Sequence, residues 1–194
     1  MQYQAPANDI RFFLFDVLGM DTLDQLEKYA EATPDLMSAI IDEAGRMASE
    51  VIQPLNKLGD EQGCSYDPET HAVSTPEGFR AAYEQFSQAG WTALDAPVDF
   101  GGQGLPHTLK LVVDEMICSC NISFGMYPGL THGAISAIHA HGSDDLKATY
   151  LEKLVSGEWS GTMCLTEPQC GTDLGLIRTC LLYTSDAADD ASSV

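Results

Sequence analysis

The chain has 194 residues, of which 44% are hydrophobic, so it is long and apolar enough to bury a core and is not disordered by composition. Lys and Arg together number 9 against 29 Asp and Glu, which gives a formal net charge of −20. This acidic excess argues against nucleic acids and anionic membranes as partners, because both are bound through basic patches.

Cysteine spacing and the amino-terminal residues limit the chemistry further. Asp9, Arg11 and Asp16 interrupt the only apolar run near the amino terminus, so we predict no signal peptide. The expected location is therefore a cytoplasm that keeps thiols reduced. We expect no metal site among the cysteines, which are scattered without any CxxC pair: Cys64, Cys118, Cys120, Cys164, Cys170 and Cys180.

Apolar residues at helical spacing dominate the beginning of the chain. Two short helical stretches are predicted over residues 10–18 and 22–29. A long helix over residues 34–58 follows, and Thr33 should cap it, because a hydroxyl, a proline and an acid stand in order there.

Turn residues mark the next segment. Residues 63–73 are predicted to form a loop or small hairpin. Thr75 repeats the helix-start pattern, and Gly90 is placed to end that helix. The Gly-Gly-Gln-Gly run at residues 101–104 lacks a βαβ context and the G-x-G-x-x-G spacing, so we interpret it as a connection between helices rather than a dinucleotide site.

A buried helical region without charge comes next. Residues 107–118 show helical spacing, and no Asp, Glu, Lys or Arg stands between Glu115 and Asp144. Polar residues interrupt this window, so a helix buried on most sides is expected and a membrane span is not. His132 and His139 have no charged partner one helical turn away, and we interpret both as hydrogen-bonded structural residues rather than catalytic ones.

A helix over residues 144–155, capped by Ser143, leads into the sequence WSGTMCLTEPQCGTDLGLIR, which begins like a strand. Pro168 has no N–H, so a regular ladder should stop there. Gly171 allows a ligand to approach the backbone, and Thr172 adds a hydroxyl donor, as an oxygen-rich ligand would require. By itself this pattern favours a structural turn over a cofactor site, and both interpretations stay open.

The longer string MCLTEPQCGTDLG resembles the flavin-binding signature of the acyl-CoA dehydrogenase family, a strand ending in Thr-Glu-Pro followed by x-Ala-Gly-Ser/Thr-Asp. Gly171, Thr172 and Asp173 match in type and spacing, whereas Cys170 and Leu176 replace the usual small residues. Three further landmarks are similar to the family: the Phe-Gly-Gly-Gln-Gly-Leu-Pro run at 100–106, the uncharged helix near 127–133, and the approach to the strand at 150–157.

The resemblance implies a mainly α fold, an acyl-CoA dehydrogenase-like amino-terminal helical domain followed by the first strand of a truncated middle β domain. It divides the chain into a helical extension at 1–33, the helical domain at 34–157, the start of the β domain at 158–179 and a non-native tail at 180–194. The extension resembles the branch that includes 3-methylmercaptopropionyl-CoA dehydrogenases and long-chain-type enzymes. The tail is similar to translated sequencing-adapter read-through; a genuine flexible tail is the alternative.

The resemblance also implies a function, the α,β-dehydrogenation of an acyl-CoA thioester with hydride transfer to FAD. An electron-transfer flavoprotein or similar acceptor and a homo-oligomeric assembly are the implied partners, and the fragment itself is expected to be inactive. Glu167 is not the expected base, because in the family the base comes from a carboxy-terminal domain. The implied flavin contacts are Met163, Leu165, Thr166 and Thr172, with Thr172 also near the substrate, and the implied acyl pocket wall is Tyr127, Gly129, Leu130 and Gly133.

Two alternatives remain open at this point. An acyl-CoA oxidase or a nitroalkane-oxidase-like flavoprotein on the same fold would differ in its use of oxygen. A helical, acidic interaction module without a cofactor would hold no flavin.

Overall fold

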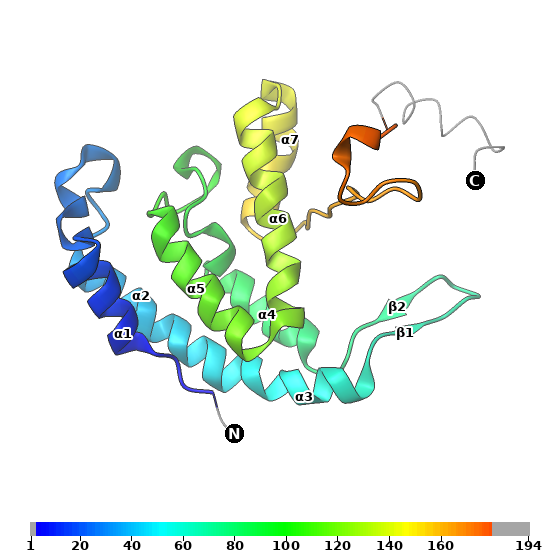
Figure 1. Cartoon of the computed structure of the whole chain (residues 1–194), viewed down its shortest axis with the longest axis horizontal. Coiled ribbons are helices and arrows are strands. Elements are labelled where there is room, and N and C mark those ends of the chain that lie inside the picture. Colours follow the sequence, from blue (N-terminus) through cyan, green and yellow to red (C-terminus); the bar gives the residue numbers. More distant parts are fainter. Residues whose placement is uncertain (1–2, 180–194) are drawn as a thin grey trace. The chain divides into compact units, whose positions relative to one another are not determined.

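The structure, a computed structural model, describes residues 3–179, and the predicted tail at 180–194 lies outside them (Figure 1). The chain divides into two compact units, one ending at Gly161 and one beginning at Thr162. None of the helices in the described part is both long and apolar enough to cross a membrane.

The first unit is built almost entirely of helices, which confirms the predicted mainly α fold. Its short hairpin pairs Ser65 with Ser74 and Tyr66 with Val73 in antiparallel register, and it extends one residue beyond the loop or small hairpin predicted at 63–73. The elements are α1 (Ala7–Arg11), α2 (Pro34–Arg46), α3 (Gln53–Gln62), β1 (Ser65–Tyr66), β2 (Val73–Ser74), α4 (Phe79–Gln88), α5 (His107–Cys120), α6 (Ile122–His141) and α7 (Asp144–Val155).

The predicted long helix is present and runs slightly further than expected, to Gln62. The hydroxyl of Thr33 accepts the N–H of Leu36 at 3.2 Å, so the predicted N-cap is confirmed. A π-helical segment, Met47–Ile52, joins α2 to α3. Inside it, the hydroxyl of Ser49 donates to the carbonyl of Gly45 at 2.7 Å and competes with the backbone for that acceptor.

Two local predictions were wrong in detail. The helix expected from Thr75 begins at Phe79, because Gly78 precedes it with a left-handed φ of 83° and provides no side-chain cap. A Cβ at Gly78 would lie 2.8 Å from a methyl carbon of Leu55, so the close approach to α3 also requires glycine. Residues 22–29 form two short 3₁₀ turns, Met20–Gln25 and Glu27–Tyr29, instead of an α-helix.

The core of the first unit lies where α5 packs against α2 and the π-helical segment, and α6 lies beside α5 and α7 (Figure 1). The side chains of Ile41, Leu109 and Met116 are almost completely buried there. Burying one such side chain contributes about 1.5–3 kcal/mol. A smaller apolar cluster joins α6 to α7 through Ile135 and Leu151.

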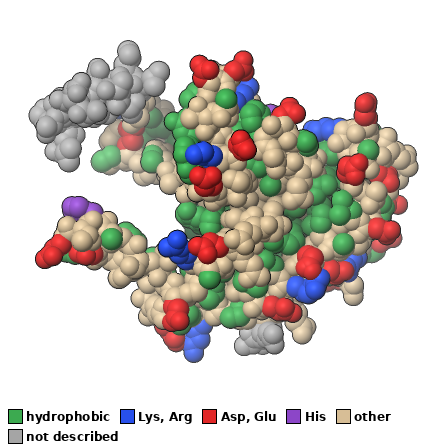
Figure 2. Space-filling model, turned by 180° about the vertical axis from the view of Figure 1, so that it is seen from behind, with side chains coloured by type: hydrophobic (Ala, Val, Ile, Leu, Met, Phe, Trp, Pro, Cys, Tyr) green, Lys and Arg blue, Asp and Glu red, His purple; other side chains and the backbone are tan. Residues whose placement is uncertain are grey.

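Acidic side chains are spread over the face shown in Figure 2 rather than gathered in one patch. This distribution agrees with a solvated acidic surface as the explanation of the net charge of −20.

The second unit differs most from the prediction. The strand expected from Trp159 is not formed, and in the described part of this unit the only ladder contact is an isolated bridge between Glu167 and Cys170. The physical reason is that a strand needs a neighbour for its N–H and C=O groups, and the described residues supply none.

Candidate functional site

One candidate region is the turn that follows Thr166. The N–H of Glu167 donates to the carbonyl of Cys170 at 2.9 Å, and the N–H of Cys170 donates back to the carbonyl of Glu167 at 3.1 Å. Pro168 and Gln169 form the tip between them. Beyond this turn, Asp173 accepts the N–H of Gly175 at 3.1 Å, which begins the 3₁₀ turn Leu174–Leu176.

Glu167 is held by the chain that returns past it. Its carboxylate accepts the backbone N–H of Arg178 at 3.0 Å and that of Thr179 at 2.9 Å. These hydrogen bonds, those from Thr179 first, lower the pKa of Glu167 to about 2. A carboxylate with this pKa holds a proton too weakly to act as a general base near neutral pH. In this structure Glu167 joins the turn to the chain that returns past it.

The residues predicted to contact the flavin are on the surface of this unit. Met163 is 65% exposed and Leu165 is 41% exposed, and Thr166 and Thr172 are exposed as well. Neither threonine hydroxyl makes a hydrogen bond to another described residue, so both are available to a ligand. A Cβ at Gly171 would meet only a methyl carbon of Thr166 at 3.9 Å, so the turn itself leaves room for a ligand at that position.

A separate candidate surface is one side of α6 in the first unit. Gly129 and Gly133 are exposed, and a Cβ at either would meet no atom within 4 Å. Leu130 is half-buried beside them, and the ring of Tyr127 packs edge-on against Tyr83 at a centroid distance of 5.0 Å. Of the four predicted residues, Tyr127 alone lines a groove of about 1290 Å³ between α3, the hairpin, α4 and α6.

The chain that enters the turn begins against the same helix. The hydroxyl of Tyr127 donates to the hydroxyl of Ser160 at 2.8 Å, and the N–H of Gly161 donates to the hydroxyl of Thr131 at 3.2 Å. Gly161 lies so close to α6 that a Cβ there would be 2.5 Å from the Cβ of Ala134. The residues just ahead of the signature are therefore fixed beside the predicted acyl-pocket wall.

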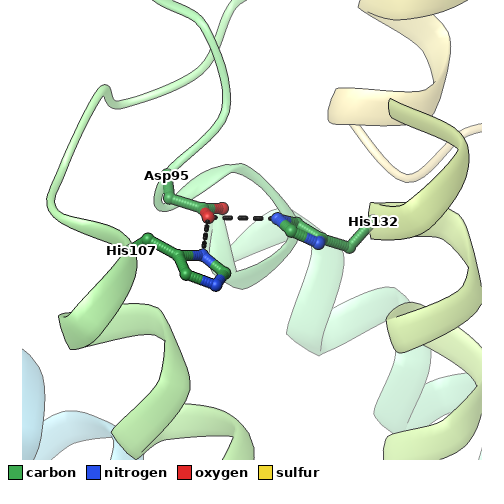
Figure 3. A group of neighbouring side chains, drawn as sticks. All are labelled: Asp95, His107 and His132. Carbon is green, nitrogen blue, oxygen red and sulfur yellow. Dashed lines mark hydrogen bonds and ion pairs between the residues drawn. The ribbon is translucent and has the colours of Figure 1, made fainter. Parts of the chain in front are cut away.

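A third group of polar residues was not predicted as a unit (Figure 3). Oδ2 of Asp95 lies 2.5 Å from Nδ1 of His107 and 3.0 Å from Nε2 of His132. Asp95 lies in the connection between α4 and α5, His107 is the first residue of α5, and His132 is in the middle of α6. Burial alone would raise the pKa of Asp95, but the hydrogen bonds from both histidines and the charges of His132 and Lys110 together lower it below its usual range.

The interpretation of His132 as a hydrogen-bonded structural residue agrees with this arrangement, but its partner was missed. Asp95 is 37 residues from His132 in the sequence, so a comparison of positions one helical turn away does not include it. For His139 the described contact is an edge-on packing of its ring against Phe100. No spacing rule in the sequence points to Asp95 or His107, because tertiary packing brings the three residues together.

Residues 34–158 match the family described as acyl-CoA dehydrogenase, N-terminal domain. The chain is 43% identical over 178 residues to the 3-methylmercaptopropionyl-CoA dehydrogenase of Ruegeria pomeroyi, a match that covers 92% of the chain and 30% of the relative. It is 33% identical over 179 residues to a butyryl-CoA dehydrogenase of Syntrophomonas wolfei, covering 91% of the chain and 29% of that protein.

The fold is similar to that of an acyl-CoA dehydrogenase complexed with FAD from Bacillus anthracis, with a TM-score of 0.55 and 22% identity. That match covers 72% of the chain and 22% of the solved structure. The chain thus spans about 30% of the length of the curated relatives it matches.

Proposed function

The chain belongs to the acyl-CoA dehydrogenase family through its amino-terminal domain, and from this membership we propose that it is the amino-terminal part of a flavin-dependent acyl-CoA dehydrogenase. The reaction is the oxidation of the Cα–Cβ bond of an acyl-CoA thioester to the enoyl-CoA. FAD, when bound, accepts the hydride from the β-carbon. A carboxylate removes the α-proton, and we propose that this base lies outside these residues, because in the family it comes from a carboxy-terminal domain.

The observation that carries the proposal is the attachment of residues 160–161 to α6. This attachment holds the residues that precede, in the sequence, the turn with the exposed Thr166 and Thr172. In the proposed enzyme, Met163 and Leu165 contact the flavin ring and the Thr166 hydroxyl bonds its polar edge. Thr172 lies near the pyrophosphate and the thioester-side arm of the substrate.

The proposed acyl pocket uses the glycine face of α6. Gly129 and Gly133 have no side chains on that face, so an acyl chain can approach the helix backbone. Leu130 supplies apolar contact. No Asp, Glu, Lys or Arg stands between Glu115 and Asp144, so an alkyl group meets no charge from this helix. The β domain is proposed to start near residue 158.

The substrate we propose is a short acyl-CoA thioester such as 3-methylmercaptopropionyl-CoA, because the relative of that name is 43% identical over nearly the whole chain. The butyryl-CoA dehydrogenase match makes butyryl-CoA the comparison substrate. An electron-transfer flavoprotein or similar acceptor, a homo-oligomeric assembly and a cytoplasmic location complete the proposal.

The experiment is a chimera that joins residues 1–178 to the remaining sequence of the Ruegeria pomeroyi relative. Anaerobic dye reduction is measured with thioesters of several chain lengths, and oxygen consumption is measured without dye. We expect dye reduction that depends on acyl-CoA, with little oxygen consumed. Rapid oxygen consumption would instead identify an oxidase, and a folded chimera without bound flavin would favour the interaction module.

A further inference from the structure

We propose that Asp95, His107 and His132 form a binding site for a first-row divalent transition metal, with Zn²⁺ as the representative ion. The three side chains come from separate elements and meet at one carboxylate oxygen (Figure 3). Their ligand atoms all lie within 4.8 Å of one another. The proposal does not depend on the proposed dehydrogenase activity, because it rests on these three residues alone.

The state of Asp95 is an independent observation that points to a ligand. Its side chain is only 7% exposed, and Oδ1 is buried without a hydrogen-bond partner among the described residues. A buried, unpaired carboxylate oxygen is costly, and both histidines bond the other oxygen. The unused lone pairs of Oδ1 leave the carboxylate able to bond a cation.

The donor set selects the class of metal. Two imidazole nitrogens and one carboxylate oxygen suit Zn²⁺ and its first-row neighbours, whereas Mg²⁺ and Ca²⁺ prefer oxygen ligands throughout. Bonds to Zn²⁺ measure about 2.0–2.2 Å for nitrogen and oxygen, so ligand atoms around one ion lie roughly 3.3 Å apart. The two oxygen–nitrogen separations, 2.5 and 3.0 Å, fall below that value, and the two histidine nitrogens lie within 4.8 Å of each other, so side-chain rotations are needed to convert the hydrogen-bonded cluster into a ligand set.

Access and charge also favour a cation. The side chain of His107 is 57% exposed, which gives an ion a path from solvent, and His132 is 24% exposed. The formal net charge of −20 raises the local concentration of cations around the chain. Lys110, the nearby cation that acts on Asp95, is itself paired with Asp114.

The test uses the untagged 194-residue chain, because a histidine tag would supply its own ligands. Zn²⁺ is removed by chelation and restored in increments, and the bound ion is counted by elemental analysis and followed by thermal unfolding. Co²⁺ is substituted in parallel, because its visible spectrum distinguishes nitrogen and oxygen ligands from cysteine thiolates. We expect one ion per chain, a higher unfolding temperature with Zn²⁺ present and no thiolate band.

The variants are His107→Gln and His132→Gln, with His141→Gln as the matched control at the exposed end of the same helix. Loss of a residue that only hydrogen-bonds a metal ligand already weakens metal binding about 10–100-fold, so loss of a ligand itself should weaken it by at least about 100-fold. His107 is the safer position for folding, because it is largely exposed. Absence of bound Zn²⁺ at millimolar concentration, a thiolate spectrum, or equal affinities in all three variants would overturn the proposal.

Discussion

At the scale of single residues, the hydrogen bonds of the turn hold Glu167 in its ionised form and make it a poor general base. It is a carboxylate in the predicted cofactor signature, yet two backbone N–H groups, those of Arg178 and Thr179, occupy its oxygens. These hydrogen bonds affect the structure of the turn as well as the chemistry of the carboxylate. The same two hydrogen bonds join the tip of the turn to the chain that returns past it.

The titration of Glu167 tests this arrangement. Its pKa is lowered from 4.5 to about 2, so the ionised form is the one that the folded turn favours. The contribution to stability is complete above the ordinary pKa of 4.5 and is lost as pH falls toward 2. Carboxyl NMR, with Glu167→Gln for assignment, should give a midpoint near 2 and a matching shift of the Arg178 and Thr179 amides. A midpoint near the ordinary value would mean that the hydrogen bonds do not form.

Thr166 is the residue whose replacement tests the proposed flavin contact. Thr166→Val keeps nearly the same volume and removes the hydroxyl, which makes no hydrogen bond to another described residue. Loss of a hydrogen bond to a buried group costs about 1–3 kcal/mol, so FAD affinity or the rate of flavin reduction in the chimera should fall about 5- to 150-fold. Thr162→Val, at an exposed position outside the signature, is the control. Unchanged affinity, spectrum and rate for Thr166→Val would contradict the assignment.

Residue-level prediction succeeded where the cause is local. The caps Thr33 and Ser143 are predictable from adjacent residues, and the hydroxyl of each accepts a backbone N–H of the first helical turn, at 3.2 and 3.3 Å. The partnership of Asp95 with His132 depends on the packing of a loop against α6, and nothing in either neighbourhood encodes it.

At the scale of elements, α7 depends on local interactions, whereas the strand that is not formed depends on a distant partner. The helix over residues 144–155 was predicted with both of its ends, because its cap and its hydrogen bonds lie within the segment. A strand is completed by a neighbour, so the strand-like pattern from Trp159 does not by itself produce one. The start of α4 was misplaced because Gly78, and not Thr75, sets the backbone direction against α3.

Two glycines of α6 give a matched prediction about packing. A Cβ at Gly125 would lie 2.5 Å from Sγ of Cys118 on α5, whereas a Cβ at Gly129 meets open space. Gly125→Ala should therefore destabilise the fold by about 1–3 kcal/mol through overpacking. Gly129→Ala should stabilise it by up to about 1 kcal/mol, because alanine favours the helix. Denaturant unfolding of the two variants measures the difference, and equal stabilities would contradict the placement of α6 against α5.

At the scale of the whole molecule, the first unit has a folded core and one helix with an open side. On α6, Ile122 is 57% exposed and Met126 is 60% exposed. Exposed apolar side chains of this kind are typical of a site that a ligand or another part of a protein covers. The family, the fold class and the turn were predictable from local sequence motifs. A partner for the exposed side of α6 was not, because the chain spans about 30% of the length of its curated relatives.

The 194-residue chain alone should hold FAD weakly and should not oxidise acyl-CoA. The turn offers two threonine hydroxyls and exposed apolar side chains, but no described carboxylate is placed as the base, since Glu167 is already bonded. Reconstitution with FAD and a dye-reduction assay with several acyl-CoA thioesters check this expectation. Turnover well above that of free flavin would show that the base lies within these residues, with Glu167 and Glu115 as the first positions to replace.

The most direct test of the central claim is the visible spectrum of the chimera, titrated anaerobically with 3-methylmercaptopropionyl-CoA and with butyryl-CoA. If residues 1–178 are the amino-terminal part of an acyl-CoA dehydrogenase, the chimera purifies with bound FAD, and the flavin absorbance bleaches in proportion to the added thioester. A folded chimera with a full complement of FAD whose absorbance no acyl-CoA thioester changes would contradict the account.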